Sequence, residues 1–159
     1  MPEQTAPVSD LIINNARLFD GMEVRDGLFS VGISGKTIDS VTTSTAKGKK
    51  AIDAAGRFLM PGLIDCHIHL NDFFHVTDEA TMAAYLDQEL PGHLLELISA
   101  GVTSIKSVGD PEDHILQTRD RLANGKLRGP RLFVTGPCFT ARESHPATTV
   151  YGQNPWYRQ

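Results

Sequence analysis

The sequence is poor in cysteine and has no long apolar segment. Its 159 residues include only two cysteines, Cys66 and Cys138, which form neither a dense disulfide framework nor a CxxC metal motif. The sequence leaves open whether they pair with each other, but so few cysteines suit a reducing compartment, and we expect a cytoplasmic protein. Residues 1–10 lack the basic start and apolar centre of a signal peptide, and no apolar run approaches the length of a membrane span. No membrane partner is therefore expected.

Excess basic charge, phosphate-binding loops and serine nucleophile motifs are also missing. Fifteen lysines and arginines stand against nineteen acidic residues, a formal charge of −4, whereas nucleic-acid-binding domains usually carry a basic stripe. Apolar residues make up 40% and charged residues 21% of the chain, as in an ordinary globular protein. These features argue against a nucleic-acid partner, a phosphate-loop enzyme and a serine hydrolase.

The pattern of apolar residues changes near Pro61. Before it, residues 11–60 consist of short, mostly antiparallel strand-like segments separated by turns, which predicts a small all-β unit after a disordered N-terminus over residues 1–10. After it, strand and helix patterns alternate, which predicts a parallel sheet with covering helices. The expected elements are strands at 63–70, 102–108 and 131–136, helices at 79–89 and 93–100 separated by Pro91-Gly92, a helix capped by Asp110 that ends near Gly125, and a loop over 137–159.

Three polar side chains interrupt the apolar segment PGLIDCHIHL, residues 61–70. Alternate residues of a strand share a face, so Asp65, His67 and His69 are expected on one face and the apolar residues with Cys66 on the other, packed under helices. Two imidazoles two residues apart can bind one metal ion, at about 2.0–2.1 Å if the ion is zinc. A bare HxH pattern is short, and two half-buried, hydrogen-bonded histidines are the ordinary alternative.

The string LMPGLIDCHIHL, preceded by IDAAGR, resembles the first barrel strand of the metal-dependent amidohydrolase superfamily. LIINNARLFDG and the lead-in IDAAGRFLMPG resemble the N-terminal sandwich half of that family. The segments SAGVTSIKSVGD, GPRLFVTGP and SHPATTVYGQNPWYR are similar to its imidazolonepropionase-like and prolidase-like branch. The resemblance covers most of residues 11–159. It implies an α/β fold with a partial (β/α) TIM-type barrel of about three strands over residues 61–159, preceded by part of a small β-sandwich over residues 11–60.

The resemblance also implies a chemistry. It implies hydrolysis of a C–N bond in a small amide, cyclic amide or dipeptide-like substrate, with a divalent metal, zinc first, bound by His67 and His69. Asp65 becomes a hydrogen-bonding support for these ligands, and His145 becomes a substrate-binding residue. The branch often reads Gly-Gly-His-Pro at that place, whereas this sequence has Glu143-Ser144-His145-Pro146. A solvent-exposed loop histidine is therefore the equal alternative for His145.

Other ligands that the resemblance implies come from later strands. A complete barrel needs about 250 residues, and residues 62–159 supply fewer than half of that number. We therefore expect a truncated N-terminal portion that is inactive alone and that self-associates through an exposed sheet edge. Two alternatives stay open: a catalytically silent binding or assembly module, and a free-standing small α/β protein with structural histidines. Stoichiometric metal together with turnover would separate an enzyme from both.

Overall fold

The computed structural model describes residues 8–158 of the chain. The chain divides into two compact units, residues 1–61 and residues 62–159, each with its own sheet. No helix in the described part of the chain is long and apolar enough to span a membrane.

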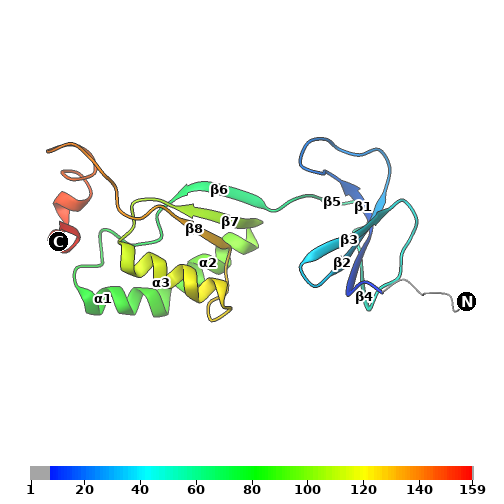
Figure 1. Ribbon diagram of the computed structural model, residues 1–159, viewed down its shortest axis with the longest axis horizontal. Helices are drawn as coiled ribbons and strands as arrows, with labels where there is room; N and C mark the ends of the chain where they lie inside the picture. Colours follow the sequence, from blue (N-terminus) through cyan, green and yellow to red (C-terminus); the bar gives the residue numbers. More distant parts are fainter. Residues whose placement is uncertain (1–7, 159) are drawn as a thin grey trace, which may run out of the picture. The chain divides into compact units, whose positions relative to one another are not determined.

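The first unit is a five-stranded sheet (Figure 1). Its strands are β1 Leu11–Leu18, β2 Phe29–Ser34, β3 Thr37–Thr42, β4 Lys50–Asp53 and β5 Phe58–Leu59. The pairs β1–β2 and β2–β3 are antiparallel, whereas β4 and β5 both pair parallel with β1. The expectation of mostly antiparallel strands is correct for β1–β3 and wrong for β4 and β5, because after β3 the chain returns to the other edge of β1. The described strands of this unit form one sheet, in which β5 pairs with β1 off the main strand order.

Alternate residues of β1 face the interior of the first unit. Ile12 and Ala16 are buried, and Asn14 between them is buried as well. The Asn14 Oδ1 accepts hydrogen bonds from Ser30 Oγ at 2.6 Å and from the Ala46 N–H at 3.1 Å, and its Nδ2 donates to the Ala46 carbonyl at 3.2 Å. The Asn14 side chain thus joins β1 to β2 and to the loop before β4, and both of its polar atoms have partners.

The expected disordered N-terminus, residues 1–10, lies outside the described residues over its first seven positions. The Ser9 Oγ donates a hydrogen bond to Asp39 Oδ1 at 2.9 Å, and the Asp10 Oδ1 accepts one from Lys49 Nζ at 2.7 Å. These two residues therefore contact the first unit.

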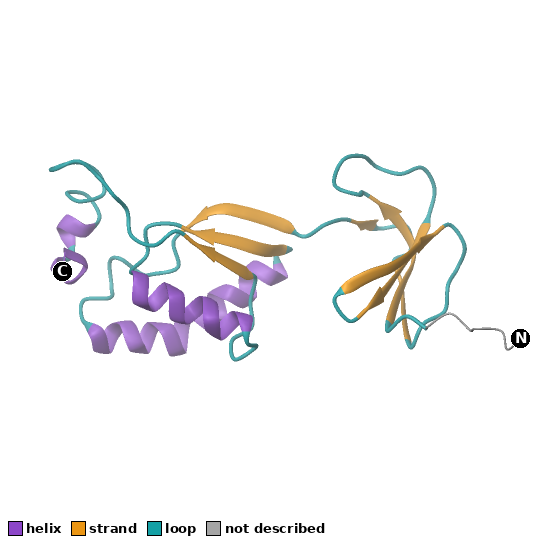
Figure 2. Cartoon of the chain, in the orientation of Figure 1, coloured by secondary structure: helices purple, strands orange, loops and turns teal. Residues whose placement is uncertain are grey.

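The second unit is a three-stranded parallel sheet covered by helices. Strands β6 Leu63–Ile68, β7 Val102–Ser107 and β8 Arg131–Val134 lie side by side in that order. Helices α1 Glu79–Ala84, α2 Leu90–Ser99 and α3 Glu112–Ala123 lie on one side of this sheet (Figure 2). The predicted alternation of strand and helix is confirmed. The segment expected as a loop after β8 also contains two short 3-10 turns, η2 Tyr151–Gln153 and η3 Pro155–Arg158.

The helical region from α1 to α2 is continuous, so the expected interruption at Pro91-Gly92 is wrong. The five residues of η1, Tyr85–Glu89, form a π-helical turn in which the Leu90 N–H donates to the Tyr85 carbonyl. Proline removes a helical donor, and its ring collides with the carbonyl four residues earlier. The wider π turn lies directly before Pro91, and it relaxes this conflict without ending the helix.

Helix α3 begins at Glu112, and Pro111 occupies its N-cap position without any side-chain cap. The expectation that Asp110 caps this helix is wrong. The Asp110 Oδ2 instead accepts hydrogen bonds from the Leu70 N–H at 2.9 Å and from Ser107 Oγ. The Asp110 carboxylate therefore accepts hydrogen bonds from donors at the ends of β6 and β7 and does not cap α3.

The core of the second unit lies between the sheet and its helices. It contains eleven buried side chains: Leu70, Val76, Met82, Tyr85, Leu86, Leu90, Leu94, Ile105, Ile115, Leu127 and Leu132. The central strand β7 contributes Ile105, which is fully buried. Helix α2 contacts β7, and α3 contacts β8. This packing fixes the carboxyl ends of the three strands, where the polar side chains of interest lie.

Candidate metal centre

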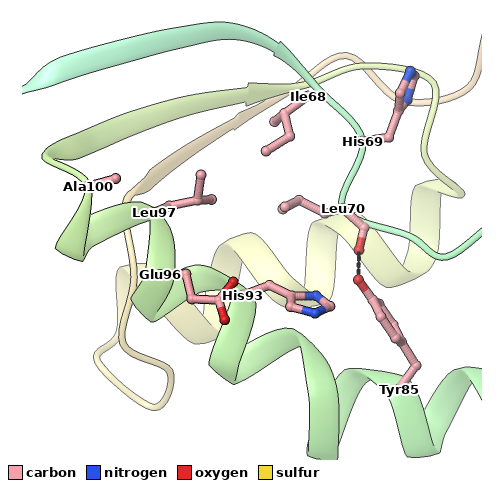
Figure 3. Close-up of a pocket in the computed structure, with 8 residues that line it drawn as sticks. All are labelled: Ile68, His69, Leu70, Tyr85, His93, Glu96, Leu97 and Ala100. Atoms are coloured by element: carbon pink, nitrogen blue, oxygen red, sulfur yellow. Dashed lines mark hydrogen bonds between the residues drawn. The ribbon is translucent and has the colours of Figure 1, made fainter.

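The histidine pair lies where β6 ends. His67 is the second-last residue of the strand, and His69 follows its last residue, Ile68. The pairing with β7 shifts by one residue between Asp65 and Ile68, which is a β-bulge on β6. Both imidazoles are exposed, and the His69 ring points away from the helical side of the strand (Figure 3). The pair thus stands at the carboxyl edge of a parallel sheet.

The two imidazole rings are neighbours. Their centroids are 5.4 Å apart, and the ring planes meet at 84°. Rings whose nitrogens bind one ion at about 2.0–2.1 Å have centroids within roughly 6 Å of each other, so the observed spacing fits shared ligation. Within residues 8–158, no three side chains of histidine, cysteine, aspartate or glutamate are grouped to hold an ion. The donors present fit two ligands of a metal site and do not complete one.

Asp65 contacts His67 through the main chain. The half-buried Asp65 side chain accepts a hydrogen bond from the His67 N–H at 2.9 Å through Oδ1. The bond lies at the bulge, where β6 departs from regular pairing. Asp65 therefore acts on the backbone that carries the first imidazole.

Cys66 does not pack under helices, contrary to expectation. Its thiol is free and exposed, as is that of Cys138, so the two do not pair. Ile64, on the face expected to be apolar and buried, is 68% exposed. The reason is that β6 is an edge strand whose first half has no covering helix among the described residues. Only the end of that face, at Ile68 and Leu70, reaches the core.

His145 lies in the segment after β8 and is exposed. Its Nδ1 is 2.6 Å from Thr149 Oγ1. Within the described residues it forms no three-ligand group with His67 and His69. His145 therefore does not add a third metal ligand to the histidine pair, and its substrate-binding role stays a prediction.

Two buried side chains hold Leu70, the residue after His69. The Asp110 Oδ2 accepts the Leu70 N–H at 2.9 Å, and the Tyr85 hydroxyl donates to the Leu70 carbonyl at 2.7 Å (Figure 3). Burial, aided by the carboxylates of Asp72 and Asp110, raises the pKa of Tyr85 to about 12. The Tyr85 hydroxyl therefore remains a protonated donor throughout the neutral range.

Gly109, two residues after the end of β7, allows a close approach between three segments. Its φ is +76°, and a Cβ built there would lie 2.6 Å from Cys138 Sγ, 3.4 Å from the Tyr151 hydroxyl and 3.7 Å from His69 Cε1. The Tyr151 hydroxyl donates to the Gly109 carbonyl at 2.7 Å. Burial, followed by the effect of Cys138, raises the pKa of Tyr151 to about 12, so this donor also persists at neutral pH.

Two hollows lie near the strand ends. The first, of 420 Å³, lies against α2 and the end of β6, and its lining includes Leu70, Tyr85 and His93 (Figure 3). The second, of 560 Å³, is lined by Gly109, Cys138, the start of α3 and the aromatic residues of the chain's last turns. Both volumes lie in the range of small-molecule sites. His69 lines the first hollow, and the second opens beside Gly109.

Sequence reasoning missed Asp110, Tyr85 and Gly109. Asp110 precedes Pro-Glu-Asp, a pattern typical of a helix start, and this local signal concealed its long-range partner Leu70. Tyr85 falls on the buried side of a helical stretch, where a tyrosine hydroxyl usually finds a hydrogen-bond partner, but no pattern names that partner. The Gly109-Asp110 pair directly after a buried strand was the available signal, since glycine there permits a positive φ.

Comparison with known proteins identifies the family of the chain. Residues 58–153 match the Amidohydrolase family. The chain belongs to the amidohydrolase family. The resemblance carried by LMPGLIDCHIHL is thereby confirmed.

Curated relatives of this amidohydrolase chain have several activities by name. An imidazolonepropionase of Vibrio vulnificus (strain CMCP6) is 31% identical, in a match that covers 61% of this chain and 32% of the relative. Adenine deaminase 2 of Rhizobium johnstonii is 34% identical, in a match that covers 65% of this chain and 15% of the relative. The chain thus spans a third or less of the length of these relatives.

Solved structures show the same fold. A Xaa-Pro dipeptidase with methionine bound in its active site superposes with a TM-score of 0.68 at 25% identity, over 87% of this chain and 36% of that one. A prolidase in complex with N-methylphosphonate-L-proline gives a TM-score of 0.66 at 23% identity, over 89% and 38% of the two chains. The second likeness shows the fold alone.

Proposed function

We propose that this chain supplies the first three strands of a (β/α) barrel and two metal ligands of an amidohydrolase that cleaves C–N bonds. The substrates are small amides, cyclic amides or peptide-like molecules. The family match over residues 58–153 and the likeness to a Xaa-Pro dipeptidase structure support this proposal.

One observation carries the proposal: His67 and His69 project from the carboxyl end of a parallel strand with ring centroids 5.4 Å apart. Active sites of (β/α) barrels lie at the carboxyl ends of the strands, where loops from several strands meet. Histidines kept only for packing would have no reason to stand exposed together at that edge.

The histidines bind a divalent cation, with zinc as the first choice because imidazole nitrogen suits this metal. A bound cation of this kind polarises the scissile carbonyl and lowers the pKa of water. The chain's own contribution is to place two imidazoles side by side, with Asp65 accepting a hydrogen bond from the His67 amide. His145 remains the proposed substrate residue of the segment after β8.

Metal content of the full 159-residue chain, measured after dialysis, tests the proposal. Hydrolytic zinc sites usually have three protein ligands, so two histidines should hold zinc weakly, and we expect no enzyme-like turnover of dipeptides, N-acyl amino acids or cyclic amides. Changing His67→Ala together with His69→Ala should abolish zinc binding. His145→Ala, the matched control with an exposed histidine in the same unit, should leave zinc binding nearly unchanged.

Equal zinc binding by the double variant and the parent chain would reject the proposed ligands. It would then favour a binding or assembly module, for which the exposed first half of β6 offers a strand edge. Light scattering on the same samples reports self-association through that edge, which we expect to be independent of zinc.

A further inference from the structure

Beyond the ligands themselves, the geometry around Leu70 points to a device that positions one of them. We infer that Asp110 and Tyr85 are positioning residues for His69, because they hold the two peptide groups of Leu70 next to it. Asp110, Tyr85 and the Leu70 backbone are called the Leu70 clamp. The inference rests on the proposed function, since it takes His69 to be a metal ligand.

The clamp begins where regular backbone pairing stops. The Val108 N–H donates to the Ile68 carbonyl at 3.0 Å, and β6 ends there. Beyond that bond, the Leu70 N–H and carbonyl go to side chains, at 2.9 Å to Asp110 Oδ2 and at 2.7 Å to the Tyr85 hydroxyl. The N–H of Leu70 belongs to the peptide group that joins it to His69. Asp110 therefore restrains the backbone of His69 directly.

Both clamp side chains are held in place by the core. Asp110 is 1% exposed, and its Oδ2 also accepts a hydrogen bond from the buried Ser107 at the end of β7. Tyr85 is 7% exposed and belongs to the core between the sheet and its helices. A side chain in a packed core has little freedom. Because the core holds both clamp side chains, the clamp restricts the motion of the exposed His69.

The remaining oxygen of Asp110 separates this role from ordinary structural bridging. Asp110 Oδ1 is buried without a hydrogen-bond partner among the described residues. Buried polar atoms are nearly always paired, and the unpaired ones are often found at functional or strained positions. Among the described residues the other unpaired buried side-chain atom is Asn71 Nδ2, next to Leu70. The acceptor at Oδ2 is the part of Asp110 that the clamp uses.

The test uses four single variants of the full chain. Asp110→Ala removes the acceptor, and Tyr85→Phe removes only the hydroxyl. Asp110→Asn keeps an acceptor for the Leu70 N–H and serves as the conservative rescue. Tyr157→Phe is the matched control, because its hydroxyl reaches the Asp72 carbonyl at 3.4 Å and not Leu70.

Three readouts are measured: the zinc dissociation constant, hydrogen exchange of the Leu70 amide, and ¹⁵N relaxation of the His69 ring without metal. Loss of groups that orient metal ligands typically weakens metal binding by about 10- to 100-fold. We expect about a 10-fold loss of zinc affinity in Asp110→Ala and in Tyr85→Phe. We also expect faster Leu70 exchange in Asp110→Ala and a more mobile His69 ring in both variants. Asp110→Asn and Tyr157→Phe should resemble the parent chain.

If the His69 ring were as rigid in Asp110→Ala and Tyr85→Phe as in the parent chain, the clamp would be rejected, even if both variants were less stable. If Asp110→Ala does not fold, Tyr85→Phe alone decides, because it keeps the ring in the core. If the double variant His67→Ala with His69→Ala bound zinc as tightly as the parent chain, the proposed function would be rejected separately from the clamp. Ring relaxation, measured without metal, then still decides whether the clamp orders His69.

Discussion

Each unit of the chain buries a polar side chain that bridges separate segments, and the two differ in how they are satisfied. Asn14 in the first unit has partners for both side-chain atoms, in Ser30 and Ala46. Asp110 in the second unit has partners for Oδ2 only, and its Oδ1 is buried without one among the described residues. The fully hydrogen-bonded Asn14 is typical of a structural bridge, whereas Asp110, close to the histidine pair, has one side-chain oxygen without a hydrogen bond.

This difference teaches how to separate structural from functional polar groups. A buried network with every member satisfied rigidifies a fold, while a partly satisfied one costs stability. The first unit has a satisfied bridge and no proposed site. The second unit has an unsatisfied bridge one residue away, through Leu70, from a proposed ligand. Incomplete satisfaction and proximity to the candidate centre coincide.

The largest expected effect that tests this comparison is that of Asn14→Ala on stability. The change leaves the buried Ser30 hydroxyl and the half-buried backbone groups of Ala46 without partners, which should lower the free energy of unfolding of the first unit by about 2–3 kcal/mol. Asp110→Ala likewise leaves two buried donors, the Leu70 N–H and the Ser107 hydroxyl, without an acceptor. It should nevertheless cost less, about 1–2 kcal/mol, because it also removes an unpaired buried oxygen. Amide exchange of β1 and of β7 reports the two units separately.

Zinc affinity should show the reverse order. Asn14→Ala should leave it unchanged, whereas Asp110→Ala should lower it. If Asp110→Ala destabilised its unit as strongly as Asn14→Ala while zinc binding stayed intact, Asp110 would be an ordinary structural bridge, and the distinction between the two units would be lost.

A smaller effect is expected from Gly109→Ala, with Gly125→Ala as its matched control. The two glycines have nearly the same φ, +76° and +75°, but a Cβ at Gly109 would meet Cys138 Sγ at 2.6 Å, and one at Gly125 would meet nothing within 4 Å. A left-handed conformation costs a residue with a Cβ roughly 1–2 kcal/mol, and this strain is shared by both variants. Chemical denaturation measures it.

Only Gly109→Ala should also displace Cys138 and disturb the surroundings of His69. We therefore expect a further weakening of zinc binding in Gly109→Ala that Gly125→Ala does not show. Identical zinc affinities in the two variants would mean that the close approach at Gly109 does not shape the candidate centre.

The sequence predicted the second unit better than the first. Alternating strand and helix patterns leave few topologies for a parallel sheet, and β6, β7 and β8 follow within a few residues of their expected ranges. The parallel pairing of β4 and β5 with β1 could not be read, because short strands carry no signal that names their partner. A break at Pro91 was predicted from the usual local effect of proline. The π turn that accommodates Pro91 depends on tertiary packing and could not be predicted.

The candidate centre was predictable only where it is local in sequence. His67 and His69 were found because a strand's period of two places them together, and a family resemblance supported them. Burial of Cys66 was wrongly expected, because alternation predicts a face and not what covers it.

Contacts between residues far apart along the chain could not be read from the sequence. The Leu70 N–H donates to Asp110 across 40 positions, and the Asn154 Nδ2 donates to the Phe73 carbonyl at 3.1 Å across 81 positions. A short polar side chain after a strand or in a loop signals that it needs a partner when buried, but the signal does not say which segment supplies that partner. The surroundings of the histidine pair therefore needed the folded structure.

The smallest expected effect is that of His75→Ala. It tests whether a short polar contact contributes little to stability when its side chains are exposed. His75 Nδ1 lies 2.6 Å from Asp72 Oδ2, with the two side chains 85% and 25% exposed. Burial raises the pKa of Asp72, but hydrogen bonds from the His75 ring and amide and from the Phe74 amide outweigh it, so the pKa lies below its ordinary 3.8. The ionised carboxylate is thus favoured in the folded state, and its contribution is present above pH 3.8 and is lost as the pH falls through the lowered pKa.

His75→Ala should therefore lower stability by less than about 0.5 kcal/mol near pH 5 and make the acid loss of stability shallower. Fluorescence of Trp156, the only tryptophan, follows unfolding of the second unit between pH 2 and pH 6, a range of roughly two units on either side of the ordinary carboxyl pKa. His145→Ala is the matched control, since that exposed ring lies 2.6 Å from the neutral Thr149 hydroxyl and should not change the acid profile. A cost for His75→Ala as large as that for Asn14→Ala would show that burial is not what separates the strong polar contacts of this chain from the weak ones.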